Sequence, residues 1–480
     1  ARFECDSDVP TLPVIDDSLE LFSFDSVYNV FKHVNVGKAS GPDKISARLI
    51  RTLADCLAEP MCTLYNNSIK QGKVPKIWKS AHITPLPKVK GANQPKDFRP
   101  IALTPILAKC FERLVSPYIK DKIDDTNQYA YRRNRSTDDA LLVLLDRITY
   151  HLDKSAKNYV RAVFIDFSSA FNTINSSILI QRLTDKQINS NIIAWVYDFL
   201  TDRSQRVKTC NEISEALTVS TGCPQGCVLS PILFSLYVEC MTVSGSNMHM
   251  VKYADDTVII ELCSPDQATN LQAEMSHIAA WCEDNSLLIN STKTKEIVFC
   301  NKRDEPNPAT LDINGSEIQR VDEYKYLGTI VEKKLSFKSN TDNIIKKANK
   351  RLYIMKQLAF LKVQPSTIRL AYTTFIESVL SYHLSIIFGH LIQDDTKLYN
   401  HTIKTARLLS NDQIERQTIN EVYDKQFKTK CLRLTCCGRD NIIALDKLPS
   451  GRYLIPKHRV NARKFCFRSN CVRLLNRIFS

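Results

Sequence analysis

Hydrophobic and polar positions along the chain follow two different periods, which predicts a mixed α+β fold. Apolar residues recur at helical spacing in several segments, and strand-like runs stand between them. The segments with helical periodicity are 26–36, 46–71, 136–152, 228–240, 265–285 and 344–361, and two more end near residue 200. Residues 159–167 form a nearly continuous apolar run, which predicts a strand buried on both faces.

Further strands are expected in proline-rich stretches and at turn signals. Residues 78–88 are strand-like, whereas the stretch 97–115 is expected to open a helix. Residues 296–300 predict another strand. The dipeptide Asn314-Gly315 between apolar flanks is a strong signal for a two-residue hairpin turn.

The longest apolar stretch of the C-terminal half, 376–392, contains Glu377, His383 and His390 and therefore predicts a packed helix. The sequence contains no run of about 18 uncharged apolar residues, the length that crosses a bilayer. We therefore expect no membrane among the partners of this protein.

Composition favours an intracellular protein with a polyanionic partner. The chain has 480 residues, of which 44% are hydrophobic, so two to four packed units are expected. Lys and Arg outnumber Asp and Glu by 65 to 51, and the excess is spread along the chain. Such a charge suggests nucleic acid, although a merely basic protein is an alternative. The 16 cysteines form no Cys-x-x-Cys pair, so we interpret them as reduced thiols rather than as a zinc site.

The tetrapeptide Tyr253-Ala254-Asp255-Asp256 is the most informative feature of the chain. Apolar, strand-like residues flank it on both sides, so the two aspartates fall at the turn of a hairpin. Carboxylates beside an apolar hairpin need cationic compensation, and Mg²⁺ takes oxygen ligands of this kind. The alternative is an ordinary acidic turn on the surface.

A third acid, Asp166, ends the buried strand over 159–167. A lone aspartate at a strand end often caps a helix. Together with Asp255 and Asp256 it could instead supply a site for two metal ions, which acids from different elements bridge. Such a site supports phosphoryl transfer without a protein nucleophile.

At these residues the chain resembles the reverse transcriptases of non-LTR (LINE-type) retrotransposons, of the jockey, CR1 and L2 kind. The resemblance covers roughly residues 30–380, and the motifs stand in the order of that family. The matching segments are 37–43, 83–88, 97–101, 128–137, 164–171, 222–231, 253–256, 290–294 and 326–328.

The resemblance implies a right-hand polymerase fold with fingers, a palm with an antiparallel sheet, and a helical thumb, followed by a basic C-terminal tail. We expect a linker or upstream remnant over 1–25, an N-terminal extension and fingers over 26–135, and the palm over 136–335. The thumb is expected over 336–400 and the basic C-terminal region over 401–480. The family also carries an upstream endonuclease in the full element, for which this sequence has no matching segment.

The resemblance also implies roles for individual residues. Asp166, Asp255 and Asp256 are the expected catalytic residues and metal ligands, for two Mg²⁺ ions or for Mn²⁺ in their place. The expected substrate-binding residues are Lys88, Arg99, Phe171, Gln225, Gly226 and Lys293. Phe171 would exclude a ribose 2′-hydroxyl, with a core phenylalanine as the alternative. Lys88 and Arg99 would contact triphosphate oxygens, and Lys293 would donate a proton to pyrophosphate; each is otherwise a surface cation.

The implied activity is RNA-directed DNA polymerisation. Its partners would be an RNA template, a DNA primer or target, and deoxynucleoside triphosphates, and we expect the protein in the nucleus and cytoplasm. Two alternatives stay open at this point. One is a decayed or domesticated element fragment that binds RNA without polymerising, and the other is a different reverse transcriptase type, such as a group II intron maturase.

Overall fold

Two units, each assembled from separate stretches of sequence, make up the fold. The computed structural model describes residues 10–16, 19–210, 212–265, 267–301, 306–436, 442–443, 445–456, 458 and 466–478. Unit 1 comprises the described residues of Ala1–Arg133, Phe167–Thr242 and His277–Asn290. Unit 2 comprises those of Asn134–Asp166, Val243–Ser276 and Ser291–Ser480. The boundaries expected above for fingers, palm, thumb and tail stay predictions.

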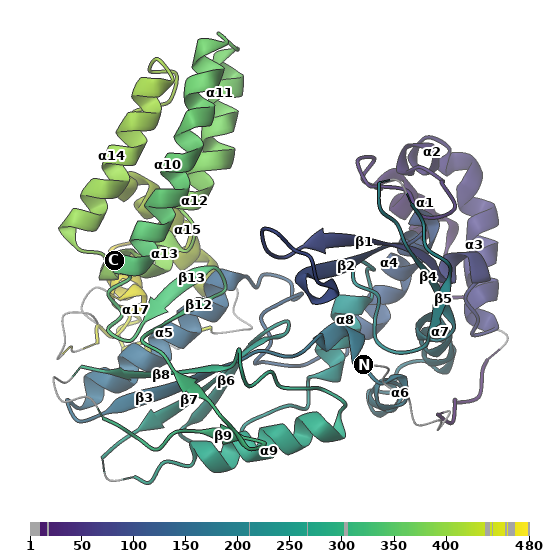
Figure 1. Ribbon diagram of the computed structural model, residues 1–480, viewed down its shortest axis with the longest axis horizontal. Coiled ribbons are helices and arrows are strands. Elements are labelled where there is room, and N and C mark those ends of the chain that lie inside the picture. The colour runs from purple at the N-terminus through teal and green to yellow at the C-terminus, as the bar shows by residue number, and fades with distance from the viewer. Residues whose placement is uncertain are drawn as a thin grey trace. The chain divides into compact units, whose positions relative to one another are not determined.

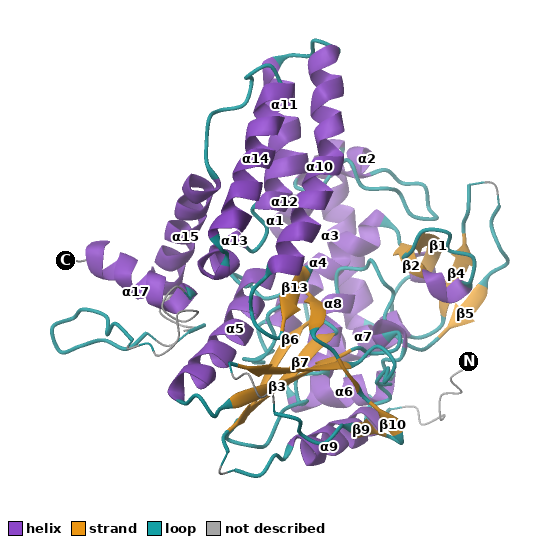
Figure 2. Ribbon diagram, turned by 60° about the vertical axis from the view of Figure 1, so that its left-hand side comes forward, coloured by secondary structure: helices purple, strands orange, loops and turns teal. Residues whose placement is uncertain are grey.

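Helices and strands are interspersed up to β13, and the described elements after it are helical, as Figures 1 and 2 show. The α-helices are α1 Phe24–Lys32, α2 Ala47–Thr52, α3 Ala54–Lys70, α4 Ile106–Lys120, α5 Thr137–Lys154, α6 Ser176–Asp185, α7 Ser190–Leu200, α8 Ser230–Tyr237, α9 Leu271–Asp284, α10 Lys338–Phe360, α11 Pro365–Tyr372, α12 Ser378–Leu380, α13 Leu384–Ile387, α14 Gln393–Leu409, α15 Ile419–Cys436 and α17 Phe467–Ile478. The strands are β1 Ser80–Pro87, β2 Phe98–Leu103, β3 Tyr159–Ile165, β4 Arg203–Val207, β5 Leu217–Val219, β6 Met248–Tyr253, β7 Asp256–Cys263, β8 Lys295–Cys300, β9 Asp312–Ile313, β10 Ser316–Glu317, β11 Gln319–Arg320, β12 Glu323–Tyr326 and β13 Thr329–Glu332. The predicted α+β class is confirmed.

A five-stranded sheet in the order β11-β8-β3-β7-β6 forms the centre of unit 2. Strand β3 lies in the middle and pairs antiparallel with both β7 and β8. Six of its seven residues are buried, because it has a strand on each side and α5 packs across it. The prediction of a buried strand in this region is therefore confirmed.

Helices α11, α12 and α14 of unit 2 pack against α10 (Figure 1), and α13, α15 and α17 pack on one another. The buried face of α10 includes Ile344, Ala348, Leu352 and Met355, as the helical period predicts. The expected single helix over 376–392 is wrong. The chain there passes through a π-helical turn at Thr373–Glu377 and the short helices α12 and α13, and His383 between them has a left-handed φ of 55°.

Unit 1 combines a four-stranded sheet, in the order β2-β1-β4-β5, with helices α1 to α4 and α6 to α8. Its core contains an aromatic cluster in which Phe111 stacks on Tyr65 and meets Trp78 and Trp195 edge-on. All four rings are buried, which anchors α3, α4 and α7 to one another.

The expected helix over 97–115 is wrong in its first half. Residues Phe98–Leu103 form strand β2, and the helix α4 begins only at Ile106. Strand β2 is an edge strand, where Pro100 can lack a backbone N–H without breaking the sheet. Pro105 then disfavours helical backbone at the residue before it, so the helix begins after it.

Within the described ranges, no helix combines the length and the apolar character needed to cross a bilayer.

Candidate active site

The paired aspartates lie where the sequence predicts, at the turn of the β6–β7 hairpin. Tyr253 pairs with Asp256, so Ala254 and Asp255 are the two turn residues. Ala254 has a φ of 57°, a left-handed value that alanine rarely adopts and that is common at functional sites. Its side chain is buried, whereas Asp255 and Asp256 are exposed. The hairpin therefore presents both carboxylates to solvent.

Asp166 stands beside this hairpin in the register of the sheet. The last pair between β3 and β7 joins Ile165 to Thr257, so Asp166 and Asp256 are each the next residue along neighbouring strands. The following 3-10 helix has Ser169 as its N-cap, so the alternative role of Asp166 as a helix cap is wrong. The strand ends thus bring two carboxylates to one edge of the sheet.

Tyr324 of β12 packs on the strand that leads to Asp166, although sequence reasoning did not single it out. Its ring stacks on Phe164 at 4.5 Å between centroids, on the face that Phe164 shares with Asp166 by alternation. Burial raises the pKa of Tyr324 to about 12, and the charges of Asp256 and Asp166 raise it further. Both aspartates therefore lie close to the phenol.

Two residues of the 290–294 segment hold Asp166. The backbone amide of Asp166 donates to the hydroxyl oxygen of Thr294 at 3.3 Å. The ammonium of Lys293 lies 3.4 Å from Asp166 Oδ2. This places the predicted Lys293 at the candidate site, while Thr294, fully buried, is a supporting residue that its own motif could have indicated.

The donor set suits a hard divalent cation. Asp166 Oδ2 is buried and accepts no hydrogen bond, which leaves a carboxylate oxygen available beside two exposed carboxylates. In the part of the chain that the structure describes, no three His, Cys, Asp or Glu side chains form a ready-made metal site. Mg²⁺ needs only one or two carboxylates and completes its shell with water and substrate phosphates, so these residues fit it.

The cysteine-rich tail is described only in part, because Cys437 and the Cys436 side chain lie outside the described residues.

Unit 1 brings several predicted substrate-binding residues together through backbone hydrogen bonds. The amide of Cys223 donates to the carbonyl of Phe171 at 2.7 Å, and the amide of Ala102 donates to the carbonyl of Gln225 at 2.7 Å. The 222–226 loop is thereby fixed between Phe171 and strand β2. The half-buried ring of Phe171 stacks on Phe234 at 4.7 Å between centroids.

Glycine is required at Gly226 for two independent reasons. Its φ is 114°, and a Cβ there would meet the carbonyl oxygen of Ala102 at 2.8 Å. Without a side chain, the loop can approach β2 closely.

Two buried charged residues, Glu112 and Arg203, hold the ends of this loop, and sequence reasoning missed both. Glu112 on α4 accepts hydrogen bonds from the amides of Val228 at 2.6 Å and Leu229 at 2.9 Å. Arg203 donates to the carbonyl of Gly222 at 2.8 Å. A lone glutamate on the apolar face of a helix was the available signal for Glu112.

Arg99 lies on β2, and Lys88 directly follows the paired strand β1. Arg99 is exposed opposite Leu86. Lys88 donates to the carbonyl of Lys96 at 3.1 Å and lines an open cavity of about 570 Å³ with neighbours from Pro87 to Phe98. Strand β2 therefore carries Arg99 near its start and touches the Gln225–Gly226 loop near its end.

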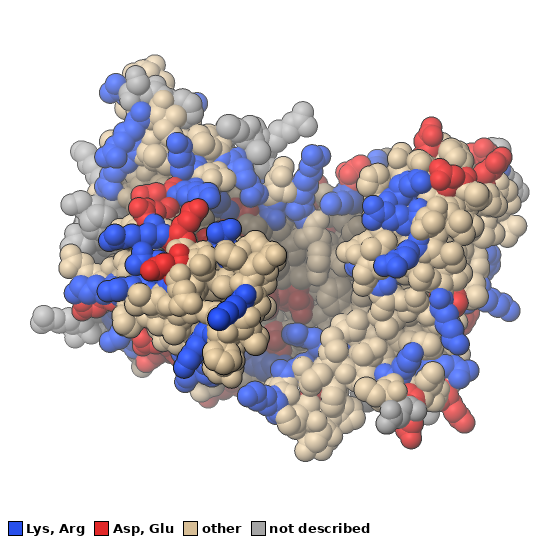
Figure 3. Space-filling view, turned by 90° about the horizontal axis from the view of Figure 1, so that it is seen from above, with Lys and Arg blue, Asp and Glu red and all other residues tan. Residues whose placement is uncertain are grey.

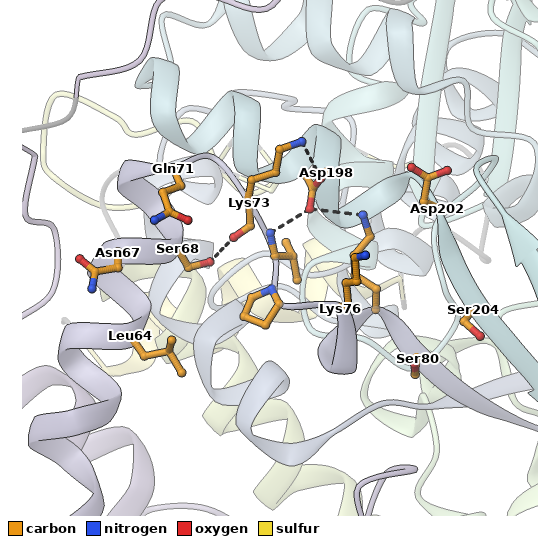
Figure 4. Close-up of a pocket in the computed structure, with 13 residues that line it drawn as sticks. Leu64, Asn67, Ser68, Gln71, Lys73, Lys76, Ser80, Asp198, Asp202 and Ser204 are labelled. Carbon is orange, nitrogen blue, oxygen red and sulfur yellow. Dashed lines mark hydrogen bonds and ion pairs between the residues drawn. The ribbon is translucent and has the colours of Figure 1, made fainter.

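A larger cavity of about 890 Å³ in unit 1 has no predicted site residue in its lining (Figure 4). Its central carboxylate, Asp198, is occupied by the ammonium groups of Lys73 at 3.1 Å and Lys79 at 3.3 Å and by the amide of Val74 at 2.8 Å. Asp198 thus anchors the 73–79 loop rather than a ligand.

Basic side chains are spread over the visible surface rather than gathered in one patch, as Figure 3 shows. One cluster in unit 2 joins Lys325 of β12 with Lys347 and Arg351 of α10. Burial lowers the pKa of Lys347, and the charges of Lys325 and Arg351 lower it further. Mutual repulsion of this kind is relieved by an anionic partner.

Comparison with known families decides the class of protein. Residues 86–331, just over half of the chain, match the model of the reverse transcriptase (RNA-dependent DNA polymerase) family. The chain belongs to the reverse transcriptase family. This membership, with the α+β architecture, confirms the predicted right-hand polymerase fold class.

This reverse transcriptase is similar to RNA-directed DNA polymerases from transposable elements, as the motifs predicted. It is 28% identical over 363 residues to the probable RNA-directed DNA polymerase from transposon BS of Drosophila melanogaster. It is 27% identical over 341 residues to the RNA-directed DNA polymerase from mobile element jockey of the same organism. The alignments cover 72% and 68% of this chain but only 39% and 37% of the two relatives.

The reverse transcriptase also resembles a solved telomerase, the apo enzyme of Candida tropicalis. The identity is 12%, the TM-score is 0.39, and the match covers 80% of this chain and 69% of the telomerase.

Proposed function

We propose that this protein is the RNA-directed DNA polymerase of a non-LTR retrotransposon. It adds deoxynucleotides to a DNA 3′-hydroxyl on an RNA template. The single observation that carries the proposal is the register of β3 and β7, which sets Asp166 next to Asp256 at the turn that contains Asp255. The 222–226 loop of unit 1, the proposed substrate loop, carries a motif that supports the same activity.

Asp166, Asp255 and Asp256 would hold two Mg²⁺ ions, or Mn²⁺ in their place. These ions, when bound, supply positive charge that offsets the triphosphate and lowers the pKa of the attacking hydroxyl. The protein's own part is to hold the three carboxylates at one edge of a rigid sheet. The Thr294 hydroxyl fixes the backbone of Asp166, and Lys293 stands ready beside its carboxylate to give a proton to the leaving pyrophosphate.

The substrate loop of unit 1 would receive the nucleotide. Phe171 presents a half-buried aromatic ring, which would clash with a ribose 2′-hydroxyl and so select deoxynucleotides. Gln225 and Gly226 would pass close to the nascent base pair, because Gly226 has no side chain. Arg99 and Lys88 would contact triphosphate oxygens, which Arg binds with two parallel hydrogen bonds.

The nucleic-acid partners would be an RNA template and a DNA primer or nicked target. The cations Lys325, Lys347 and Arg351 are suited to the phosphate backbone of that duplex, whose binding should weaken as salt rises. A polymerase that copies an element's transcript at a chromosomal target would work in the nucleus after assembly in the cytoplasm.

Primer extension tests the proposal directly. The full chain is incubated with a DNA primer annealed to an RNA template, deoxynucleotides and Mg²⁺, and extension is compared with that of Asp255→Asn. We expect extension by the wild type and a loss of roughly 10³-fold or more in the variant, because a metal ligand is removed. Equal binding of both proteins to the template–primer serves as the control.

The same experiment separates the alternatives. Binding of RNA with no extension by the wild type, under conditions in which a known reverse transcriptase extends the primer, would favour the domesticated or decayed fragment. Equal extension by wild type and Asp255→Asn would refute the assignment of the site.

A further inference from the structure

Two ion pairs attach the C-terminal region to helix α5. Lys430 of α15 pairs with Asp139 at the start of α5. Arg468 of α17 pairs with Asp146, seven residues further along the same helix. Asp139 is 1% exposed and Lys430 is 7% exposed, so this charge pair is removed from solvent. Helix α5 packs in turn on strands β3, β6 and β7, which carry or adjoin the three aspartates (Figures 1 and 2).

Several groups converge on the N-terminal end of α5. The hydroxyl of Ser136 donates to Asp139 Oδ2 at 2.8 Å, and Arg433 of α15 donates to the carbonyl of Asn134 at 2.9 Å. Burial raises the pKa of the neighbouring Asp138, and the charge of Lys430 opposes that rise. Lys430 thus pairs with Asp139 and, together with Arg433, offsets the charge of Asp138.

Asp138, near the start of α5, lies close to the segment 381–383, which separates helix α12 from helix α13. Its Oδ1 lies 3.5 Å from His383 Nε2, and the other ring nitrogen, Nδ1, lies 2.7 Å from the hydroxyl of Thr329. Burial lowers the pKa of His383 to about 3, and the charge of Lys430 contributes. A neutral ring therefore lies between Asp138 and the first residue of β13, with a hydrogen bond to Thr329 and with its Nε2 packed against Asp138 without one.

Tyr382, the residue before His383, contacts the turn between β12 and β13. The hydroxyl of Tyr382 donates to the carbonyl of Leu327 at 2.8 Å. A Cβ on Gly328 would meet the Tyr382 ring at 3.1 Å, so the ring packs closely on this glycine. The turn between β12 and β13 is therefore clamped by Tyr382 and His383. Its strand β12 carries Tyr324, whose ring stacks on Phe164 of β3, two residues before Asp166.

The active-site hairpin adjoins the same group of residues. Helix α5 packs on β6, whose last residue, Tyr253, precedes the turn that contains Asp255. Helix α5 thus supports the hairpin that carries Asp255, and Tyr382 and His383 hold the β12–β13 turn.

We propose that Lys430 is a positioning residue for polymerisation, which acts from the C-terminal region through Asp139, Asp138 and His383 on the β12–β13 turn and the Tyr253 hairpin. This inference rests on the proposed function. In this proposal the C-terminal region neutralises the carboxylates of Asp139 and Asp138 and thereby positions the active site, beyond any general contribution to stability.

The physical reason lies in the asymmetry of buried ion pairs. Removal of one partner leaves a buried charge uncompensated, whereas removal of both can be nearly neutral. Without Lys430, Asp139 and Asp138 would draw in water or move outward, and His383 and Tyr253 would move with them. Small displacements at a distance from the chemistry are enough to lower turnover strongly.

Steady-state primer extension with the full chain tests the inference. We expect Lys430→Met to lower kcat roughly 10- to 100-fold, with little change in the KM for the nucleotide, because the catalytic geometry rather than substrate binding is disturbed. The double variant Lys430→Met with Asp139→Asn should recover to within about threefold of the wild type, since no unpaired charge remains.

Arg468→Met supplies the matched control. It removes the cation of the other ion pair between the C-terminal region and α5, and we expect kcat to stay unchanged even where the melting temperature falls. An equal loss of kcat in this control, an unchanged kcat in Lys430→Met, or a double variant as impaired as the single one would each overturn the inference.

Hydrogen exchange gives a second readout that does not depend on activity. Lys430→Met should speed amide exchange in residues 324–331 and 250–257, and the Arg468 control should not. Should the wild type fail to extend a primer, the proposed function fails while exchange still tests the coupling. Unchanged exchange in both segments would refute the coupling itself.

Discussion

Lys293 Nζ lies 3.4 Å from Asp166 Oδ2, the buried carboxylate oxygen that accepts no hydrogen bond. The lysine thus compensates the charge of a proposed metal ligand and stands beside the place where pyrophosphate would leave. These two roles have opposite consequences when the lysine is removed. Loss of the competing ammonium should favour cation binding, and loss of the proton donor should slow the reaction.

We therefore expect Lys293→Met to lower kcat roughly 10²-fold, the usual contribution of a general acid, while the Mg²⁺ concentration for half-maximal rate falls. Single-nucleotide addition over a series of Mg²⁺ concentrations measures both. Lys295→Met is the control on the same segment, since Lys295 donates to Thr292 and Gln319 rather than to an aspartate. A wild-type kcat in Lys293→Met would remove the proton-donor role.

Gly226 should tolerate no side chain. We expect Gly226→Ala to cost about 1–3 kcal/mol of unfolding free energy from backbone strain alone, and to impair primer extension because the loop must leave β2. Gly315→Ala is the control, because Gly315 also has a positive φ of 76° but has no atom within 4 Å of the new Cβ. Denaturant unfolding should therefore show a larger loss at Gly226, and extension should be lost only there.

Phe171 should determine the choice of sugar. We expect Phe171→Ala to raise the ratio of ribonucleotide to deoxynucleotide incorporation roughly 10- to 100-fold, because space for the 2′-hydroxyl is opened. Competition between the two nucleotides on one template measures the ratio. Phe199→Leu removes another stacked ring of unit 1, the partner of Trp195, and should leave the ratio alone. An unaltered ratio in Phe171→Ala would favour the core-phenylalanine interpretation.

Glu112 should make stability depend on pH. Burial raises its pKa from 4.5 to about 7 in the folded protein, although the amides of Leu229 and Val228 oppose the shift. The folded state therefore keeps a proton that the unfolded state loses as the pH rises from 4.5 to 7, so this group destabilises the fold progressively over that interval. The total is about 3 kcal/mol, since one pKa unit is worth about 1.4 kcal/mol.

Comparison with Glu112→Gln isolates this effect, because glutamine resembles the protonated acid and does not titrate. We expect the variant to lose little stability between pH 5 and pH 8, while the wild type loses more over the same range. Thermal unfolding of both proteins across this range measures the difference, and parallel profiles would contradict the shifted pKa.

Local signals were sufficient for the elements that carry the aspartates. The apolar run of β3 and the apolar flanks of the Asp255 turn both reflect burial within one sheet, so the pattern of the sequence records them directly. Asn314-Gly315 forms its turn with positive φ at both residues for the same local reason. The position of Asp166 at the strand end follows from where the apolar run stops.

Features that depend on distant partners could not be predicted in this way. Phe98–Leu103 pairs as an edge strand with β1, which overrides its helical pattern. The break at His383 depends on Thr329 and Asp138, more than 50 residues away. Glu112 and Lys430 likewise become informative only when their partners are known, because a charged residue on a helix is ordinarily a solvated one.

The register of β3 and β7 is tested most directly by single-nucleotide addition with Asp166→Asn, next to wild type and Asp322→Asn. Asp322 is an exposed acid of unit 2 that pairs with Lys333, so its substitution controls for the loss of one negative charge. We predict that Asp166→Asn binds the template–primer normally and loses roughly 10³-fold or more in rate, and that Asp322→Asn matches the wild type. Addition by Asp166→Asn at the wild-type rate would contradict the account.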